Sequence, residues 1–259
     1  MISKQEERLE KILSILKLSN PATVNKLAQL IEVSHMTIRR DIEILEREKK
    51  VEVFHGGIML PDSQRRENWK EYTLADATSI MCEEKKRIGL KAALMLKNND
   101  SLILDTGSTT EYISQSLNPE YSLSIVCFTL NTLIHVSKLK KSKIIFPGGY
   151  FHRNTLMFES EEGISILKKN RAAIAFVSAS GISLSLGVTC SNSYERETKK
   201  TIMGSSMKKV LVADSSKFDI VHSTYFAELQ DFDTVITDEG IPDKYRTFCN
   251  NNNIELLTV

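Results

Sequence analysis

Short apolar segments recur through residues 84–259, and stretches of helical length separate them. In chain order these segments read SLILD, SIVCF, KIIF, AAIAFVSASG, KKVLVADSSKF and DTVITD. Strands that alternate with helices in this way are typical of a mostly parallel sheet with helices on its faces. The sequence therefore predicts an α/β fold for this part of the chain, which begins with a helix from about Glu84 to Leu96.

Small polar residues follow three of these predicted strands, in the loops Asp105–Thr110, Ser178–Gly181 and Asp214–Lys217. Ligands bind at the carboxyl ends of strands in sheets of this kind, and backbone N–H groups at a helix start attract anions. Each loop alone also fits an ordinary turn, because Ser, Gly and Asp are common in turns. Three such loops in one sheet predict a phosphate pocket. The sequence has no P-loop motif and no GxGxxG after a strand, which argues against a nucleotide ligand.

The first 58 residues are predicted to form a compact helical unit. Apolar residues at helical spacing predict a helix from about Ser3 to Leu16. Thr23 and Ser34 are suitable N-caps for two further short helices joined by a tight turn. The inward residues of the last of these helices are expected to be Ile38, Ile42 and Leu45.

The outward side of this third helix carries polar residues near its start. Two short helices, the second polar at its N-terminal end, form the arrangement that enters the major groove of DNA. The strand Val51–Phe54 and the turn His55–Gly57 predict a wing beside them, and so a winged helix-turn-helix. A solvated helix face would show a similar charge pattern. The predicted DNA-binding residues are Ser34, His35, Met36, Thr37, Arg39 and Arg40.

Charge gives mixed support to DNA binding. The formal net charge of the chain is +1, which weakly argues against a nucleic-acid binder. The local distribution matters more than the sum, and basic residues gather around the third helix. They are Arg39, Arg40, Arg47, Lys49 and Lys50.

Other patterns limit the remaining classes of protein. The four cysteines are far apart and include no CxxC motif, so we expect no metal site, disulfide framework or cofactor. No segment approaches the roughly 20 apolar residues that cross a bilayer, which predicts a cytoplasmic protein without a membrane partner. Helical periodicity is lost after Ile58. We therefore predict an N-terminal domain (1–58), a linker (59–83) and a C-terminal domain (84–259).

Six motifs, in this order, resemble the DeoR family of bacterial transcription regulators over essentially the whole chain. They are VSHMTIRRDIEILEREKKVEVFHGG, LILDTGSTT, AFVSASGI, GVTCSN, VLVADSSKF and FDTVITD. The resemblance implies a winged helix-turn-helix that binds double-stranded operator DNA. It also implies a sugar-phosphate-sensing domain akin to ribose-5-phosphate isomerase, and a homo-oligomer.

The resemblance also implies an effector site. Its lysines would neutralise a phosphate and its carboxylate would accept sugar hydroxyls. Glu195 and Lys199 would equally fit a solvated i, i+4 pair on a helix. Asp41, in the recognition helix, is expected to orient an arginine, because DNA phosphates would repel it. The expected effector-binding residues are Asp105, Gly107, Ser108, Thr109, Thr110, Ser180, Gly181, Glu195, Lys199 and Lys217.

Two positions depart from the family pattern. Lys49 stands where family members commonly have glycine, so we expect a longer or differently shaped turn before the wing. Ser183 stands near the position where many members carry an acidic residue, and this removes a base that isomerase chemistry would need.

The observations together with this resemblance predict a repressor that a phosphorylated sugar releases. The resemblance implies that it controls a sugar or nucleoside catabolic operon and that deoxyribose 5-phosphate is among the candidate effectors. No catalytic residue is assigned. The alternative is a sugar-phosphate isomerase-like enzyme, whose base would have to be Asp105, Glu195 or Asp214.

Overall fold

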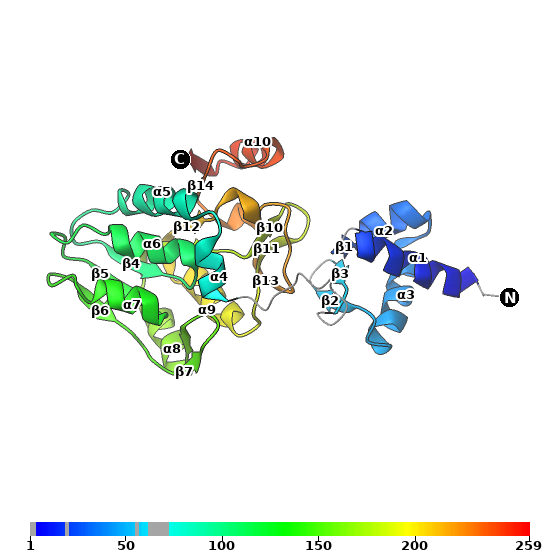
Figure 1. Cartoon of the computed structure of the whole chain (residues 1–259), viewed down its shortest axis with the longest axis horizontal. Helices are drawn as coiled ribbons and strands as arrows, with labels where there is room; N and C mark the ends of the chain where they lie inside the picture. Colours follow the sequence, from blue (N-terminus) through cyan, green and yellow to red (C-terminus); the bar gives the residue numbers. More distant parts are fainter. Residues whose placement is uncertain (1–3, 19–20, 55–56, 62–72) are drawn as a thin grey trace. The chain divides into compact units, whose positions relative to one another are not determined.

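The computed structural model describes residues 4–18, 21–54, 57–61 and 73–259. Contacts divide the chain into two compact units, residues 1–71 with 223–225 and residues 72–222 with 226–259 (Figure 1). Among the described residues, the first unit contains one cluster of buried apolar side chains and the second contains two, so each unit has a core of its own, as is expected of a domain.

The first unit is a winged helix-turn-helix. Its helices are α1 (Lys4–Leu18), α2 (Val24–Ile31) and α3 (His35–Arg47), and its antiparallel sheet has the order β1 (Ala22–Thr23), β3 (Gly57–Met59), β2 (Glu52–Phe54). The sequence predicted all three helices and the wing. The expected cap at Ser3 and the turn residues His55 and Gly56 lie outside the described residues. Gly57, which the sequence predicted in the turn, is instead the first residue of β3.

Side-chain caps fix where α2 and α3 begin, as predicted. Thr23 Oγ1 accepts a hydrogen bond from Lys26 N at 3.0 Å, and Ser34 Oγ accepts one from Thr37 N at 3.2 Å. The inward residues of α3 are buried as expected and pack against α1, α2 and the sheet in one core. This core includes Ile12, Leu16, Leu27, Ile38, Ile42, Leu45 and Ile58.

Asp41 lies on the buried side of α3 and binds an arginine of α1. Its side chain is wholly inaccessible, and its Oδ1 accepts a hydrogen bond from Arg8 Nη2 at 2.8 Å, with a second contact from Arg8 Nε. This bidentate pair raises the pKa of the Arg8 guanidinium, chiefly through the hydrogen bond. Asp41 does orient an arginine, and this arginine ties α1 to the recognition helix.

Lys49 follows α3 in a left-handed backbone conformation, with φ at +55°. Its N–H donates to Glu46 O at 2.9 Å, and the N–H of Lys50 donates to Leu45 O at 2.8 Å. These two bonds form the Schellman motif that normally ends on glycine. The expectation of a differently shaped turn is therefore wrong, because lysine keeps the glycine turn at a cost of about 1 kcal/mol.

The second unit is built on a seven-stranded parallel sheet, which confirms the predicted α/β class. Its order is β15 (Glu255–Thr258), β14 (Thr234–Thr237), β12 (Ser206–Val212), β9 (Ala172–Ser178), β4 (Ser101–Leu104), β5 (Ser124–Cys127), β6 (Lys143–Ile145). The chain runs outward from β4 to β6 and returns to β9. The strand order therefore reverses between β4 and β9, and ligands bind outside such a reversal in α/β sheets.

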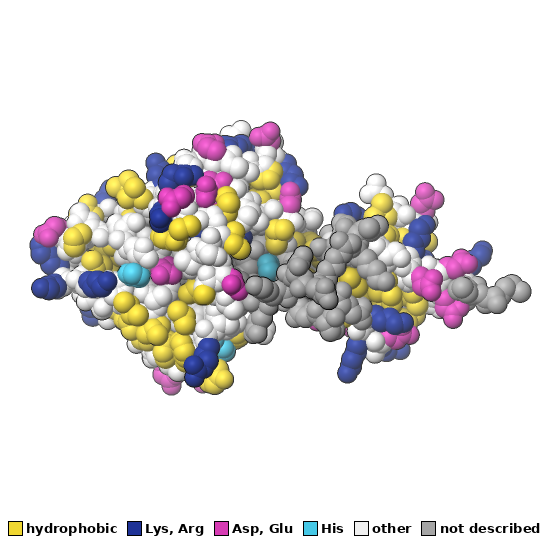
Figure 2. Space-filling view, viewed as in Figure 1, with side chains coloured by type: hydrophobic (Ala, Val, Ile, Leu, Met, Phe, Trp, Pro, Cys, Tyr) yellow, Lys and Arg dark blue, Asp and Glu magenta, His cyan; other side chains and the backbone are white. Residues whose placement is uncertain are grey.

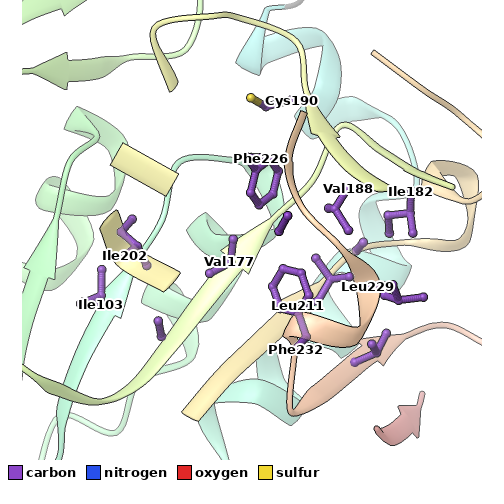
Figure 3. Packing of buried hydrophobic residues seen from close by; sticks show 14 of the residues in the cluster. Ile103, Val177, Ile182, Val188, Cys190, Ile202, Leu211, Phe226, Leu229 and Phe232 are labelled. Atoms are coloured by element: carbon purple, nitrogen blue, oxygen red, sulfur yellow. The ribbon is translucent and has the colours of Figure 1, made fainter. Parts of the chain in front are cut away.

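Helices cover both faces of this sheet (Figure 1). Leu102 and Leu104 of β4 pack with α5 (Cys82–Ala93), α6 (Ser108–Ser116) and α7 (Leu130–Val136). Ile103, between them, points to the other face, which is covered by α8 (Glu161–Lys169), α9 (Glu195–Gly204) and α10 (Asp243–Asn251). Figure 3 shows part of this second cluster, including Val177, Leu211 and Ile202. Because successive side chains of a strand point to opposite faces of the sheet, the core is divided into two layers, one on each face.

Shorter elements complete the unit. Two antiparallel hairpins join β7 (Tyr150–His152) to β8 (Met157–Glu159) and β10 (Gly181–Ser183) to β11 (Gly187–Cys190). Strand β13 spans Thr224–Ala227, and the short 3-10 helices are η2 (Ser215–Lys217) and η3 (Leu229–Asp231).

The stretch predicted as a linker, 59–83, contains a helix. Residues 62–72 lie outside the described residues, and α4 spans Leu74–Ser79, capped by Thr73, whose Oγ1 accepts from Asp76 N at 3.1 Å. Leu74 and Ala77 of α4 are buried. The helix is too short for an apolar period to reveal it, and for that reason the sequence suggested a linker. The helix expected at about Glu84–Leu96 is α5 and begins earlier, at Cys82.

Candidate functional site

The polar residues at the start of α3 lie on the protein surface. Ser34, His35, Arg39 and Arg40 are exposed, Met36 is 61% exposed, and Thr37 is half-buried. They lie away from the buried residues Ile38, Ile42 and Leu45, and Figure 2 shows Lys and Arg side chains around α3. This helix therefore presents a basic surface that can enter a DNA groove.

The two hydroxyls of this surface bond to each other. Ser34 Oγ and Thr37 Oγ1 lie 2.9 Å apart, and Ser34 Oγ also accepts from Thr37 N. These hydroxyls therefore fix the start of the helix. The longer side chains of Met36, Arg39 and Arg40 extend beyond them and are the better placed to reach base edges.

A narrow polar pocket lies at the strand ends where the sheet order reverses. It is lined by Ala77, Thr106, Gly107, Ser108, Thr109, Ser178, Ala179, Ser180, Glu195 and Lys217. Six of the ten expected effector residues are in this lining. They are Gly107, Ser108, Thr109, Ser180, Glu195 and Lys217.

The N-terminus of α6 forms one wall of the pocket. Gly107 is its N-cap, and no side chain caps the first turn. The backbone N–H groups of a helix start are donors and carry a partial positive charge, so this wall suits an anion. Gly107 has φ at +145°, and a Cβ there would lie 2.4 Å from Ser178 Oγ. Only glycine allows the loop to approach β9 so closely.

Thr110 is buried and shapes this loop from within, away from the pocket lining. Its hydroxyl donates to Asp105 O at 2.8 Å and to Gly107 O at 2.9 Å. Thr106, which belongs to the predicted loop Asp105–Thr110 but is not among the expected effector-binding residues, supplies a pocket hydroxyl instead. Its Oγ1 donates to Glu195 Oε2 at 3.1 Å.

Lys199 and Asp105 form a buried ion pair outside the pocket lining. Lys199 Nζ lies 2.5 Å from Asp105 Oδ2 and donates to Ser178 O at 3.1 Å. The same Asp105 oxygen accepts from Ser178 N at 3.0 Å. Burial alone would lower the pKa of Lys199, but the charges of Asp105 and Glu195 outweigh it and raise that pKa. The pair therefore joins β4, β9 and α9, and the ammonium is not displayed to a ligand.

Glu195, at the start of α9, is the carboxylate of the pocket. Its Oε1 accepts from Asn192 Nδ2 at 2.8 Å, and its Oε2 lies 3.8 Å from Lys199 Nζ. These contacts hold the carboxylate in one orientation. It can accept hydroxyl hydrogens from a ligand, and it would repel a phosphate placed beside it.

Lys217 is half-buried on η2 and lines the pocket. Among the described residues no carboxylate lies within ion-pair distance of its ammonium, so it is the lysine best placed to meet an anion. Gly181 has a packing role, because a Cβ there would lie 2.5 Å from Ile220 O. Ser178 and Ala179 belong to the predicted loop Ser178–Gly181 but are not among the expected effector-binding residues, and both line the pocket. Nothing in the sequence indicated that Ala77 lines the pocket, because the sequence did not predict the helix α4 that carries this residue.

Comparisons with known proteins agree with this two-part architecture. The model of the DeoR-like helix-turn-helix domain matches residues 8–64, and that of the DeoR C-terminal sensor domain matches residues 80–239. The deoxyribose operon repressor of Escherichia coli strain K12 is 32% identical over 257 residues, covering 99% of this chain and 100% of that protein. The regulator GolR of Listeria innocua is 29% identical and covers 91% of each chain.

Among solved structures, ribose 5-phosphate isomerase A of Methanocaldococcus jannaschii matches with a TM-score of 0.39 and 15% identity, over 52% of this chain and 53% of that one. Within the described segments, no helix is both long and apolar enough to cross a membrane. The two domain matches and the full-length relative together show that this chain belongs to the DeoR family of transcriptional regulators.

Proposed function

We propose that this regulator represses a sugar or nucleoside catabolic operon and that a phosphorylated sugar releases it from operator DNA. The observation that carries the proposal is the uncapped N-terminus of α6, which opens on the polar pocket where the strand order reverses. Such a helix start is a ready binding site for a phosphate.

The pocket has opposite charges at two places, which suits a ligand that is an anion at one end and an alcohol at the other. The phosphate would lie against the first turn of α6 and the ammonium of Lys217, while Glu195 would accept the sugar hydroxyls. Asp105 and Lys199 would act from beneath by fixing the loop and α9. Deoxyribose 5-phosphate is a candidate because a relative is named for the deoxyribose operon.

We place the DNA-binding region in residues 1–58, with direct readout by Met36, Arg39 and Arg40 and helix-start contacts by Ser34, His35 and Thr37. A homo-oligomer would present two copies of α3 to repeated half-sites. We place the start of the effector domain at α4 rather than at residue 84, because Ala77 lines the pocket.

A sugar-phosphate isomerase remains the rival, since Glu195 is a carboxylate inside the pocket. Deprotonating a sugar carbon needs a base beside that carbon. Asp105 pairs with Lys199, and Asp214 lies 3.6 Å from the ammonium of Lys85. These two carboxylates are thus held in ion pairs, and the base of the rival enzyme would have to be Glu195. Conversion of ribose 5-phosphate by the pure protein would favour the rival.

Fluorescence anisotropy tests the proposal. A labelled fragment from upstream of the protein's own gene cluster is titrated in fixed salt, because phosphate contacts make DNA affinity steeply salt-dependent. We expect tight binding that one member of a panel of pentose and hexose phosphates weakens by about 5- to 150-fold. Equal affinity for the labelled fragment and for random DNA would contradict specific operator binding. If no sugar phosphate weakens the binding, the proposed class of effector is contradicted.

A further inference from the structure

Two asparagines connect the pocket carboxylate to α4. Asn192 donates from Nδ2 to Glu195 Oε1 at 2.8 Å, and its Oδ1 accepts from Asn154 Nδ2 at 3.2 Å. The backbone oxygen of Asn154 then accepts from the N–H of Leu74 at 2.7 Å, and Leu74 is the first residue of α4. An unbroken chain of contacts therefore runs from the pocket to the start of this helix.

Neighbouring groups hold Asn154 in place. Its Oδ1 accepts from the hydroxyl of Tyr194 at 2.8 Å, and that hydroxyl also lies 3.1 Å from Thr155 Oγ1. The ring of Tyr194 stacks on His152, with centroids 3.5 Å apart, and His152 Nε2 lies 2.7 Å from Glu159 Oε2. Since Tyr194 directly precedes Glu195 at the start of α9, Asn154 contacts this part of the chain both through Tyr194 and through Asn192.

The other end of α4 is fastened by a buried lysine that sequence reasoning did not single out. Lys85 Nζ donates to Ala77 O at 2.5 Å and to Ile80 O at 2.7 Å, and it lies 3.6 Å from Asp214 Oδ2. Burial lowers the pKa of Lys85, with a further contribution from the charge of Lys217, although Asp214 acts in the opposite direction. Asp214 in turn caps η2, the 3-10 helix that carries Lys217. Both ends of α4 are therefore tied to residues that connect to the pocket.

Helix α4 lies in the pocket wall and also follows the DNA-binding unit in the sequence. This helix of six residues cannot be stable alone, so its neighbours decide where it lies. Ala77, near its middle, is part of the pocket wall. In the sequence α4 follows the segment that leads from the DNA-binding unit, because the second unit begins at residue 72. A ligand that displaces α4 would therefore act on the first described element that follows the DNA-binding unit in the sequence.

Resting on the proposed function, we infer that α4 is the element that reports pocket occupancy to the DNA-binding unit, and that Asn192 and Asn154 are positioning residues that connect it to Glu195. When a sugar hydroxyl engages Glu195, the carboxylate exchanges partners and the relay through Asn192 changes. An effector can shift the protein only if it binds the two positions of α4 with different affinity, and this relay supplies such a difference.

The test compares Asn192→Ala and Asn154→Ala with wild type and with Asn170→Ala. Asn170 is a matched control, because its side chain donates a hydrogen bond to Ile166 O at the end of its own helix and, among the described residues, to no other group. Hydrogen exchange of the α4 amides is measured first, without a sugar. We expect exchange about tenfold faster in both relay variants and unchanged in the control, because local opening governs amide exchange. Unchanged exchange in both relay variants would overturn the inference whatever the effector proves to be.

The second readout is the loss of DNA affinity that the sugar-phosphate panel causes. The relay predicts a full response in wild type and the control. In Asn192→Ala and Asn154→Ala it predicts DNA affinity within about twofold of wild type without sugar, and a response reduced about tenfold or more. Tyr194→Phe keeps the ring and loses the hydroxyl, so its response should be intermediate. A wild-type response in both asparagine variants would overturn the relay.

Failure of the proposed function has a different signature. If no sugar phosphate of the panel changes the DNA affinity of the wild-type protein, the proposed effector is contradicted. The exchange measurement, repeated with inorganic phosphate as the probe, then decides the relay alone.

Discussion

Lys199 Nζ lies 2.5 Å from Asp105 Oδ2, and both side chains are buried beneath the loop that begins α6. The pair occupies the place where β4, β9 and α9 meet, and Ser178 contacts both of its members. A lysine expected to meet a phosphate is thus a fixed part of the sheet edge. This position changes what substitution of Lys199 should do.

Lys199→Met should unfold at lower denaturant concentration than wild type, because it leaves the carboxylate of Asp105 buried without its partner. We expect a loss of about 3–5 kcal/mol in the free energy of unfolding. Adding Asp105→Asn should recover most of that loss, since the amide oxygen can still accept from Ser178 N. Lys208→Met removes an exposed pair with Glu255 and should cost less than about 1 kcal/mol. Equal losses for the two lysines would contradict the buried role.

The pH dependence of this loss follows from the raised pKa of Lys199. A lysine whose pKa is higher in the folded protein stabilises the fold fully at any pH below its pKa in the unfolded chain, about 10.4. This stabilisation is lost as the pH rises through the pKa of the lysine in the folded protein. The difference in unfolding free energy between wild type and Lys199→Met should therefore stay constant from about pH 7 to 9. A difference that already shrinks within this range would mean that the lysine pKa is not raised.

Gly107→Ala should abolish sugar-phosphate binding while DNA binding persists. The new Cβ meets Ser178 Oγ, and φ at +145° is unfavourable for alanine. Gly148→Ala is the control for backbone strain alone, because φ is +72° there and no atom of the described residues lies within 4 Å of the Cβ position. Isothermal titration with the active sugar phosphate should show binding to Gly148→Ala and none to Gly107→Ala. Normal binding to Gly107→Ala would show that the loop does not need its close approach to β9.

The sequence was sufficient for features that depend on local pattern. Spacing placed Ile38, Ile42 and Leu45 in the core, and hydroxyl caps placed the starts of α2 and α3. Partners distant in sequence could not be found this way. Arg8 and Asp41 are 33 residues apart, and an i, i+4 pair such as Glu195 and Lys199 has the same pattern whether it is solvated or buried. The short helix α4 shows no apolar periodicity in the sequence. The place of Ala77 in the pocket wall and the chain of contacts from Glu195 to Leu74 could therefore not be predicted.

Lys49→Gly should stabilise the helix-turn-helix unit by about 0.5–1 kcal/mol. Glycine adopts the left-handed conformation without the penalty that lysine pays, and part of the gain is lost to the greater freedom of glycine in the unfolded chain. Lys50→Gly is the matched control, because Lys50 is not among the residues with positive φ and should lose stability slightly. Thermal unfolding of the full chain, followed by a probe in this unit, measures both. A lower unfolding temperature for Lys49→Gly would contradict the strained turn.

Arg40→Ala should weaken specific DNA binding by about 1–3 kcal/mol and relax discrimination at one base pair, if the exposed guanidinium reads guanine. Lys11→Ala, exposed on α1, is the control for loss of one positive charge. Anisotropy with the operator and with single-base variants separates readout from simple charge. A uniform loss across all sequences would assign Arg40 to a phosphate.

Met36→Ala tests the remaining part of the recognition surface. This side chain is 61% exposed and apolar among polar neighbours on α3, and apolar side chains in the major groove contact the methyl group of thymine. Deoxyuridine lacks only that methyl, so replacing thymines of the selected operator one at a time removes the contact from the DNA side. If Met36 reads a thymine, one deoxyuridine should weaken wild-type binding by about 1 kcal/mol and leave Met36→Ala unaffected, because the contact is already lost. Additive losses at every thymine would show that Met36 and the methyl groups act independently, and readout would then rest on the arginines.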